Sequence, residues 1–226
     1  MAERSWRWAG GRTAVLRSVG AGIGGRNPYD AFLILTLDAA LHDDDKGLEQ
    51  AANVLLSEAR SDASWPADLA RSGRALRLFF TGQWNDPRFD SGLDTGTLPS
   101  IPWVRLWVSL KLGKEPSAVL AAVRAKLDDS DAPRIGQLLE AECLRRAGRL
   151  DEALPLADEA RREVARSAAS SYEDFGWLPL AEWELGRCLL DQGRIEEARE
   201  HLRFVAEQAP ATWFGKDARR RVRSGS

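Results

Sequence analysis

The residues of this chain that could do chemistry fall into small groups, and none of them forms a complete catalytic set. His42 stands before three aspartates, Asp43 to Asp45, and nitrogen and oxygen ligands of this kind can bind divalent metals. Adjacent residues rarely all point at one ion, so we favour a solvated loop in which Asp45 lies near the start of the next helix. The other histidine, His201, stands alone. Because acid–base and nucleophilic catalysis lack partners here, we expect no enzyme activity, no cofactor and no metal.

Two short motifs resemble known sites but lack the context that those sites need. Gly20, Gly22 and Gly25 have the spacing of the dinucleotide fingerprint, which requires a helix that opens at the last glycine and meets the pyrophosphate. Residues 26–28 read Arg-Asn-Pro, which is typical of a turn, so a flexible arm is favoured. The Asp-Thr-Gly triplet at 94–96 resembles that of aspartic proteases. That chemistry needs two carboxylates, and the chain has one copy, so a loop is favoured.

The two cysteines, Cys143 and Cys188, occupy equivalent places in two similar stretches of sequence. Residues 143–153 read CLRRAGRLDEA and residues 188–198 read CLLDQGRIEEA, 45 residues apart. A bridge between neighbouring helices stays open as an alternative, but two buried, reduced thiols are the favoured interpretation. Internal repeats of this length are typical of stacked helical hairpins.

Each copy has the pattern of a helix, a glycine stop and a second helix. In the second copy, Gly193 follows a stripe of leucines, and only glycine adopts the left-handed C-terminal conformation without strain. The next helix shows apolar spacings of three and four residues at Ile195, Ala198, Leu202 and Val205. Ala198 is small where the two helices must approach closely, and Pro210 ends the unit. We therefore expect Ala198, and Ala153 of the first copy, to be buried.

The residues Leu185-Gly186, Leu189, Ala198 and Pro210 resemble the tetratricopeptide repeat pattern. Strong resemblance covers residues 133–210. The pattern departs from the family at several points, since Glu182 stands where the tryptophan is expected, with Trp183 beside it. The first copy keeps Ala153 but lacks a closing proline. The resemblance implies a stack of antiparallel helical hairpins.

Glycines that follow apolar runs extend the repeat toward the N-terminus. They are Gly47, Gly82, Gly113, Gly148 and Gly193, with spacings of 35, 31, 35 and 45 residues. The added length in the last interval falls at residues 167–175, as a loop or as extra helical turns. Residues 86–99 read as a loop. We predict an all-α solenoid of about four to five tetratricopeptide-like hairpins and a C-terminal capping helix.

Four segments follow from this organisation. Residues 1–27 form a basic, glycine-rich lead-in; residues 28–130 form divergent helical hairpins; residues 131–211 form two tetratricopeptide-like repeats; and residues 212–226 form the capping helix and tail. A final helix with a polar outer face is what a repeat array needs at its end.

Composition excludes several classes of protein. The hydrophobic fraction of 44% supports a folded core, and a net charge of −2 gives no global field that would recruit nucleic acid or a membrane. Arginine far outnumbers lysine, which indicates a GC-rich bacterial genome rather than a function. No apolar run approaches the length of a membrane span, and residues 1–25 lack a secretory hydrophobic region. We therefore expect a cytoplasmic protein.

The family resemblance implies a non-catalytic adaptor or scaffold, with the first helix of each hairpin lining a groove that binds a protein or peptide. Counting back from the glycines places these residues on that face: Trp103, Trp107, Leu110 and Lys111; Leu138, Glu142, Arg145 and Arg146; Trp183, Arg187, Leu190 and Asp191. Tryptophan and arginine often dominate binding energy, so the partner should carry apolar anchors with acidic flanks. The alternative is that Trp103 and Trp107 pack against the N-terminal hairpins.

A rival function uses the basic C-terminal run, Arg219 to Arg221 with Arg223 and Lys216. Such runs can bind phosphates, which would make the chain a regulatory or nucleic-acid-associated module. We favour the solvated face of a capping helix and expect no nucleic acid partner. The oligomeric state and the identity of the partner stay open.

Overall fold

The computed structural model describes residues 46, 65–89, 98, 100–128, 133–167 and 172–224. Several sequence-based predictions fall outside these residues. They concern the glycine triplet at 20–25, the histidine-aspartate run at 42–45, the helix stop at Gly47, the triplet at 94–96 and the lead-in over residues 1–27.

The described part of the chain is helical, and none of its residues lies in a strand, so the all-α prediction is confirmed there. The helices are α4 (Trp65–Thr81), α6 (Ile101–Lys111), α7 (Pro116–Leu127), α8 (Pro133–Arg146), α9 (Leu150–Ser167), α10 (Tyr172–Asp191), α11 (Ile195–Gln208) and α12 (Trp213–Ser224). Within these helices, none combines the length and the apolar run that a bilayer span requires.

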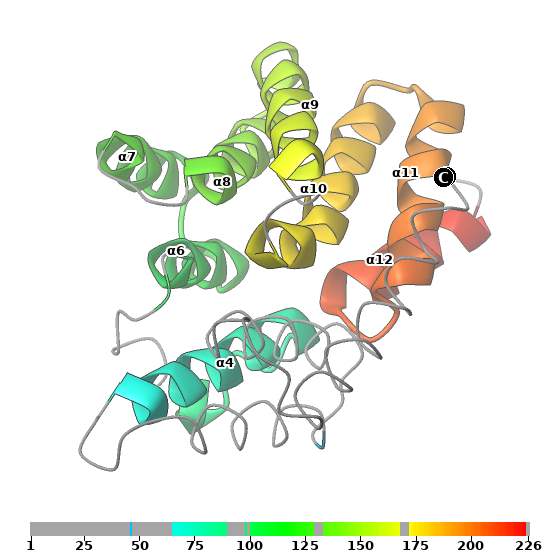
Figure 1. Cartoon of the computed structure of the whole chain (residues 1–226). Coiled ribbons are helices and arrows are strands. Elements are labelled where there is room, and N and C mark those ends of the chain that lie inside the picture. The colour runs from blue at the N-terminus through cyan, green and yellow to red at the C-terminus, as the bar shows by residue number, and fades with distance from the viewer. Residues whose placement is uncertain are drawn as a thin grey trace.

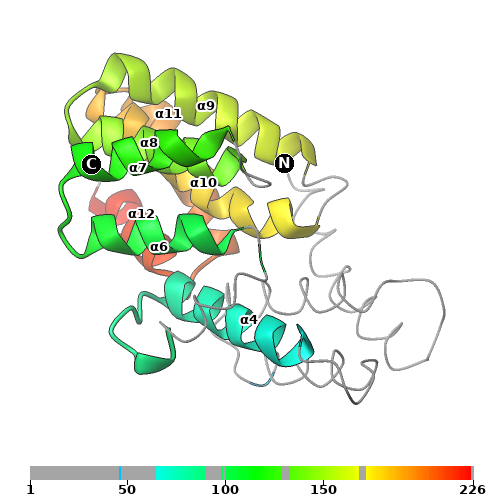
Figure 2. The same cartoon turned by 90° about the vertical axis from the view of Figure 1, so that its left-hand side faces the viewer.

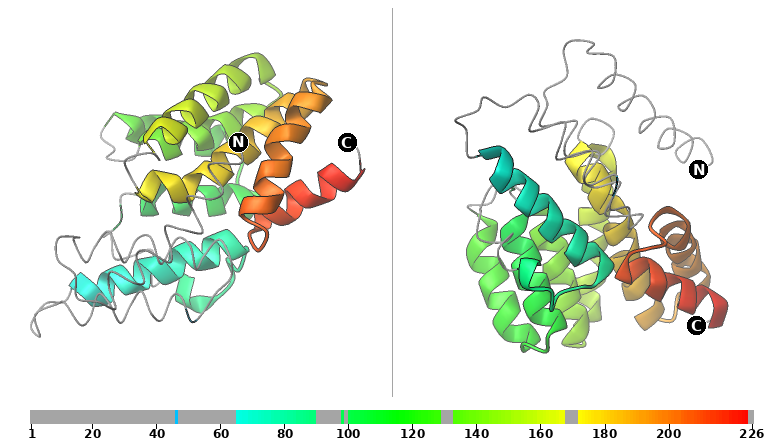
Figure 3. Two further views of the ribbon diagram at one scale, coloured as in Figure 1. Left: turned by 45° about the vertical axis from the view of Figure 1, so that its right-hand side comes forward. Right: turned by 90° about the horizontal axis from the view of Figure 1, so that it is seen from below.

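Successive helices from α6 to α12 pack against one another, as Figures 1 and 2 show. The pairs α6–α7, α8–α9 and α10–α11 are hairpins, and α7–α8, α9–α10 and α11–α12 join one hairpin to the next element. The first helices also contact each other, α6 with α8, α8 with α10, and α10 with α12. Helix α4 packs on α6 and on α12, so it bridges the two ends of this row (Figure 3).

The helix ends agree with several local predictions. The expected last helix is α12, and α11 ends at Gln208, two residues before Pro210. The long interval between the last two glycines is filled largely by helix, because α9 runs to Ser167 and α10 begins at Tyr172. Ala153 and Ala198 are fully buried, as predicted. Close approach between α10 and α11 is also marked by Gly186, where an added Cβ would lie 3.0 Å from Leu202.

The four predicted glycine stops that lie in the described residues share one helix-ending geometry. Gly82, Gly113, Gly148 and Gly193 have φ values of 80°, 95°, 74° and 77°. At Gly148, the glycine N–H donates to the Arg145 carbonyl at 3.0 Å and the Arg149 N–H donates to the Leu144 carbonyl at 2.9 Å. This pair of bonds is the Schellman motif, which satisfies the free carbonyls at a helix end. The sequence signal therefore has a direct conformational cause.

Replacement of these glycines should destabilise the protein through backbone conformation alone. An added Cβ at Gly148 or Gly193 would meet no atom within 4 Å, so the cost is that of a positive φ. We expect Gly148→Ala and Gly193→Ala each to lower the free energy of unfolding by about 1–2 kcal/mol in urea titrations. Gln192→Ala, one residue before Gly193, is the control and should change it by less than about 0.5 kcal/mol. Unchanged stability in both glycine variants would contradict the assignment.

Candidate functional site

The inner faces of α6, α8 and α10 carry a group of charged residues where apolar packing would be expected. We call this group the inner cluster. Its members are Lys111, Glu142, Arg145, Arg146, Glu184, Arg187 and Asp191. Glu142 and Glu184 are 0% exposed and Arg145 is 9% exposed. Buried charges are costly unless they are paired, so their partners decide what the cluster can do.

Arg145 joins α8 to α10 through its guanidinium group. It donates to Glu142 Oε2 from Nη2 at 2.6 Å and from Nε at 3.0 Å, and from Nη1 to Asp191 Oδ2 at 2.7 Å. Its Nε also lies 3.5 Å from Glu184 Oε1. Burial opposes the charge, but Glu184, Glu142 and Asp191 raise the pKa of Arg145. Arg145 is therefore a permanent cation at the centre of the cluster.

Glu142 pairs with cations from two helices and so connects α8 to α6. Its Oε1 accepts a hydrogen bond from Arg146 Nε at 2.7 Å and lies 3.6 Å from Lys111 Nζ. Arg146 also donates from Nη1 to the Leu110 carbonyl at 3.1 Å, at the C-terminal end of α6, where the helix dipole favours a cation. Burial opposes ionisation, but Arg145, Lys111 and Arg146 lower the pKa of Glu142 to about 2.

Glu184 is the buried carboxyl group of the cluster whose contact with a cation is long, 3.5 Å from Arg145 Nε. Its Oε2 is buried without a hydrogen-bond partner in the described part of the chain, and its Oε1 accepts a weak bond from Cys188 Sγ at 3.6 Å. Burial and the negative charge of Glu142 raise the pKa of Glu184 to about 8. The two buried carboxyl groups of the cluster thus titrate far apart, Glu142 as an anion and Glu184 as an acid at neutral pH.

Lys111 lies inside a cage of three tryptophan rings, from α6, α10 and α12. Its Nζ is 4.0 Å from the ring centroid of Trp213, 4.8 Å from Trp183 and 5.6 Å from Trp107. Rings at these distances attract a cation through their π faces. Burial lowers the pKa of Lys111 to about 8, against the pull of Glu142. At neutral pH the ammonium is therefore held in the cage by both the rings and the carboxylate.

Trp213, the first residue of α12, is the hub of a larger aromatic core. Its ring lies with centroid distances between 4.9 and 6.2 Å against Phe79, Trp84, Trp107, Trp183 and Phe214. These residues come from α4, the segment after it, α6, α10 and α12. From the side of α4, Phe80 adds a contact to Trp177 at 5.1 Å. Helix α12 is also fixed to α10, because Trp183 Nε1 donates to Asp217 Oδ2 at 2.9 Å.

The predicted groove residues are brought together, but most of them are not open to a partner. Trp103 and Trp183 are 1% exposed, and Trp107 and Leu138 are 0% exposed. Trp213 of α12 packs on Trp107 and Trp183, and the ring of Trp103 packs against Gly136 of α8. These four residues are buried and so do not form an exposed groove wall. The rings of Trp103 and Trp107 lie against α8 and α12, whereas the alternative had placed them against the N-terminal hairpins.

The polar members of the predicted site divide between the interior and the rim. Glu142 and Arg145 are buried structural charges, whereas the side chains of Arg146 and Asp191 are 30% and 37% exposed. Arg187 is mostly buried, stacks on Trp183 at 5.1 Å and lies 3.6 Å from Asp217. Burial lowers the pKa of Arg187. Surface access to the cluster therefore runs through Arg146 and Asp191.

Three central residues were not anticipated from the sequence, namely Glu184, Trp213 and Asp217. Trp213 opens a helix that was expected to be a polar cap, and its apolar side is the signal that could have shown its role. Glu184 lies next to Trp183, but this helix was predicted from its apolar residues alone, so a buried acid on it was not expected. Their roles depend on contacts with other helices, which the local pattern does not encode.

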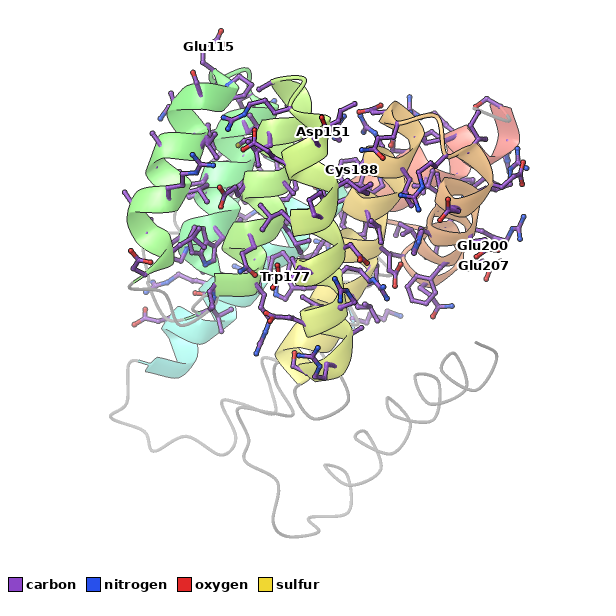
Figure 4. The ribbon with its side chains drawn as sticks, turned by 90° about the horizontal axis from the view of Figure 1, so that it is seen from above. Glu115, Asp151, Trp177, Cys188, Glu200 and Glu207 are labelled. Carbon is purple, nitrogen blue, oxygen red and sulfur yellow. The ribbon has the colours of Figure 1, made fainter. Side chains whose placement is uncertain are left out.

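The cysteines are buried, free thiols. Burial raises the pKa of Cys143 to about 12, and it also raises the pKa of Cys188. Figure 4 shows Cys188 and Trp177 between helices, while Glu115, Asp151, Glu200 and Glu207 lie at the outside of the array. In the described ranges no three histidine, cysteine or acidic side chains are grouped to hold a metal ion.

The basic run on α12 is split between two faces. Arg221 turns toward the array and donates to Asp217 at 2.9 Å, and Arg220 also pairs with Asp217 at 3.2 Å. The exposed cations recur at helical spacing on the outer side, at Lys216, Arg219, Arg220 and Arg223. A solvated face on a terminal helix is the arrangement predicted for a cap.

No family model, curated protein or solved structure matches this chain. The functional argument consequently depends on the geometry of the helices and of the inner cluster.

Proposed function

We propose that this chain is a non-catalytic adaptor or scaffold of the tetratricopeptide-like kind, working in the cytoplasm, which binds a segment of another protein. The observation that carries the proposal is the repeated hairpin, with α6–α7, α8–α9 and α10–α11 each turning at a glycine of positive φ. Stacked hairpins produce extended surfaces, and such arrays act mainly by presenting them.

The burial pattern changes where the partner should bind. The tryptophans of the first helices stabilise the interior, so they do not serve as anchors in this conformation. The available edge of the same face is the rim at the C-terminal ends of α8 and α10, where Arg146 and Asp191 reach the surface. Arg187 lies behind this rim with limited exposure. We propose that a partner segment with acidic residues docks along this edge.

The test is an affinity purification of the tagged full chain from its native cells, followed by cross-linking mass spectrometry and a binding assay with the purified partner. We expect cross-links near the ends of α8 and α10. Arg146→Ala with Arg187→Ala should weaken binding by at least about tenfold, because an arginine anchor contributes on the order of 2 kcal/mol. Arg145 is unsuitable for this test, since its loss would disturb folding.

The control is Arg162→Ala, at a mostly exposed arginine on α9, which should leave the affinity unchanged. Both variants must show the wild-type helical circular dichroism spectrum before binding is compared. If no specific partner is cross-linked, or if the double variant binds as tightly as the wild type, the proposed docking edge is incorrect.

A second candidate function is supported by the exposed stripe of Lys216, Arg219, Arg220 and Arg223. A regulatory or nucleic-acid-associated module would use this stripe to neutralise phosphates. Phosphate-driven binding falls steeply with salt concentration, because each neutralised phosphate releases counterions, whereas docking of a short acidic segment on the rim involves fewer charges and should fall less steeply. A salt titration of the complex therefore separates the two functions.

A further inference from the structure

Two buried carboxyl groups face each other across successive first helices. Glu142 of α8 and Glu184 of α10 are both 0% exposed, and Arg145 is the cation that contacts them both, at 2.6 Å and 3.5 Å. Glu142 Oε2 accepts two hydrogen bonds from this guanidinium, while Glu184 keeps an oxygen without a partner in the described part of the chain. Two carboxylates at such a site repel each other, so one of them holds a proton.

We propose that Glu142 and Glu184 form a proton-operated contact between α8 and α10, in which a proton held on Glu184 keeps the two helices packed and its release weakens that contact. The unpartnered Oε2 is the atom that an ionised Glu184 could not satisfy. Leaving a buried charge without partners costs far more than leaving a neutral acid there. Glu142 and Glu184 lie where α8 and α10, the first helices of two successive hairpins, meet. Loss of the proton should therefore change the packing distance between these hairpins.

The charged groups that face Glu184 come from three helices. They are Lys111 of α6, Glu142 and Arg145 of α8, and Arg187 with Cys188 of α10. Arg145 is already shared with Glu142 and Asp191, and Arg187 is turned to Asp217. Lys111 lies in the tryptophan cage and pairs with Glu142. Each nearby cation is thus shared with another acid. Arg145 and Arg187 lower the pKa of Glu184, but burial and the charge of Glu142 outweigh them.

The sign of the pH dependence follows from the direction of each shift. The pKa of Glu184 is raised from 4.5 to about 8, so its stabilisation is complete below about pH 4.5 and is lost as the pH rises toward 8. The lowered pKa of Glu142, about 2, acts only below about pH 4.5. The lowered pKa of Lys111, about 8, acts in the opposite sense and only above about pH 8. Between about pH 5 and 8, Glu184 is therefore protonated in the folded chain and ionised in the unfolded chain, and this difference produces the pH dependence.

The first test compares urea unfolding of the full chain and of Glu184→Gln across about pH 5 to 8. Glutamine has the shape of the protonated acid and cannot ionise. We expect the unfolding constant of the wild type to rise relative to the variant with pH, approaching the one-proton limit of about tenfold per pH unit. Differences caused by histidines cancel in this comparison. Parallel pH profiles of the two proteins would overturn the proposal.

Glu140→Gln is the matched control, because Glu140 lies on α8, is largely buried and pairs with Arg124 at 2.7 Å outside the inner cluster. This variant should keep the wild-type pH profile. A loss of the pH dependence here as well would overturn the assignment to Glu184.

A second test, infrared spectroscopy, uses the wild-type protein alone and so does not depend on whether a variant folds. The infrared spectrum of the wild type should contain the carbonyl stretch of one buried protonated carboxylic acid at about pH 6, and this band should vanish by about pH 9. Absence of the band at the lower pH would overturn the proposal, whatever the behaviour of Glu184→Gln.

Discussion

Arg145→Ala should lower the free energy of unfolding by about 3–5 kcal/mol, because it leaves buried carboxyl groups without their shared cation. Glu142 is fully buried and loses its shortest contact, and Asp191 loses its bond from α8. Urea unfolding followed by circular dichroism at about pH 7 measures this loss. We also expect faster hydrogen exchange at the C-terminal ends of α8 and α10, where the guanidinium group joins the helices.

The matched control for this prediction is Arg149→Ala, four residues further along. Arg149 makes an ion pair with Glu152 at 2.7 Å that resembles the pair between Arg145 and Glu142 at 2.6 Å, with the same spacing of three residues. Both members of this pair are exposed, so its loss should change stability far less than the loss of Arg145 does. Equal effects of the two substitutions would show that burial of the inner cluster contributes nothing to stability.

Trp213→Ala should cost about 3–5 kcal/mol, because it removes a ring that packs on residues from α4, α6 and α10. The ring also covers the Lys111 ammonium at 4.0 Å, so the cation loses its nearest π face. Thermal or urea unfolding measures the total loss. Hydrogen exchange should locate it at α12 and α4, the helices that Trp213 holds against the row of first helices.

Trp213→Phe keeps an aromatic ring at this place and should cost clearly less than the alanine variant. Its indole N–H has no hydrogen-bond partner in the described part of the chain, so the phenyl ring forfeits mainly packing area. If phenylalanine and alanine were equally damaging, or if α12 exchanged no faster in Trp213→Ala, the hub role of this residue would be contradicted.

Local features of the fold could be predicted because each has a cause within one or two helical turns. A glycine after an apolar stripe marks a helix stop, and Gly113, Gly148 and Gly193 indeed have positive φ. A small residue in the middle of the second helix marks close packing, and Ala153 and Ala198 are fully buried. These inferences needed only the spacing of residues and the conformational freedom of glycine.

The sequence could predict which residues share one side of their helices, but not whether that side is exposed or buried. The phase counted from each glycine placed Trp107, Glu142 and Trp183 on one face, and in the structure all three contact Lys111. It did not indicate that α12 packs onto this face, because contacts such as Trp107 with Trp213 join residues far apart in the sequence. The same limit applies to Glu184, whose raised pKa depends on Glu142 of another repeat.

The central claim is that the first helices enclose a buried interior of tryptophans and charges, and hydrogen exchange of the indole N–H groups in the ¹⁵N-tryptophan-labelled full chain tests it most directly. Assignment follows from single Trp→Phe variants. We predict that the indole N–H of Trp107, on a residue that is 0% exposed, exchanges only as fast as the protein opens, many orders of magnitude slower than in a free peptide. Exchange of Trp107 at the rate of a solvent-exposed indole would contradict the account, because the face would then be an open groove.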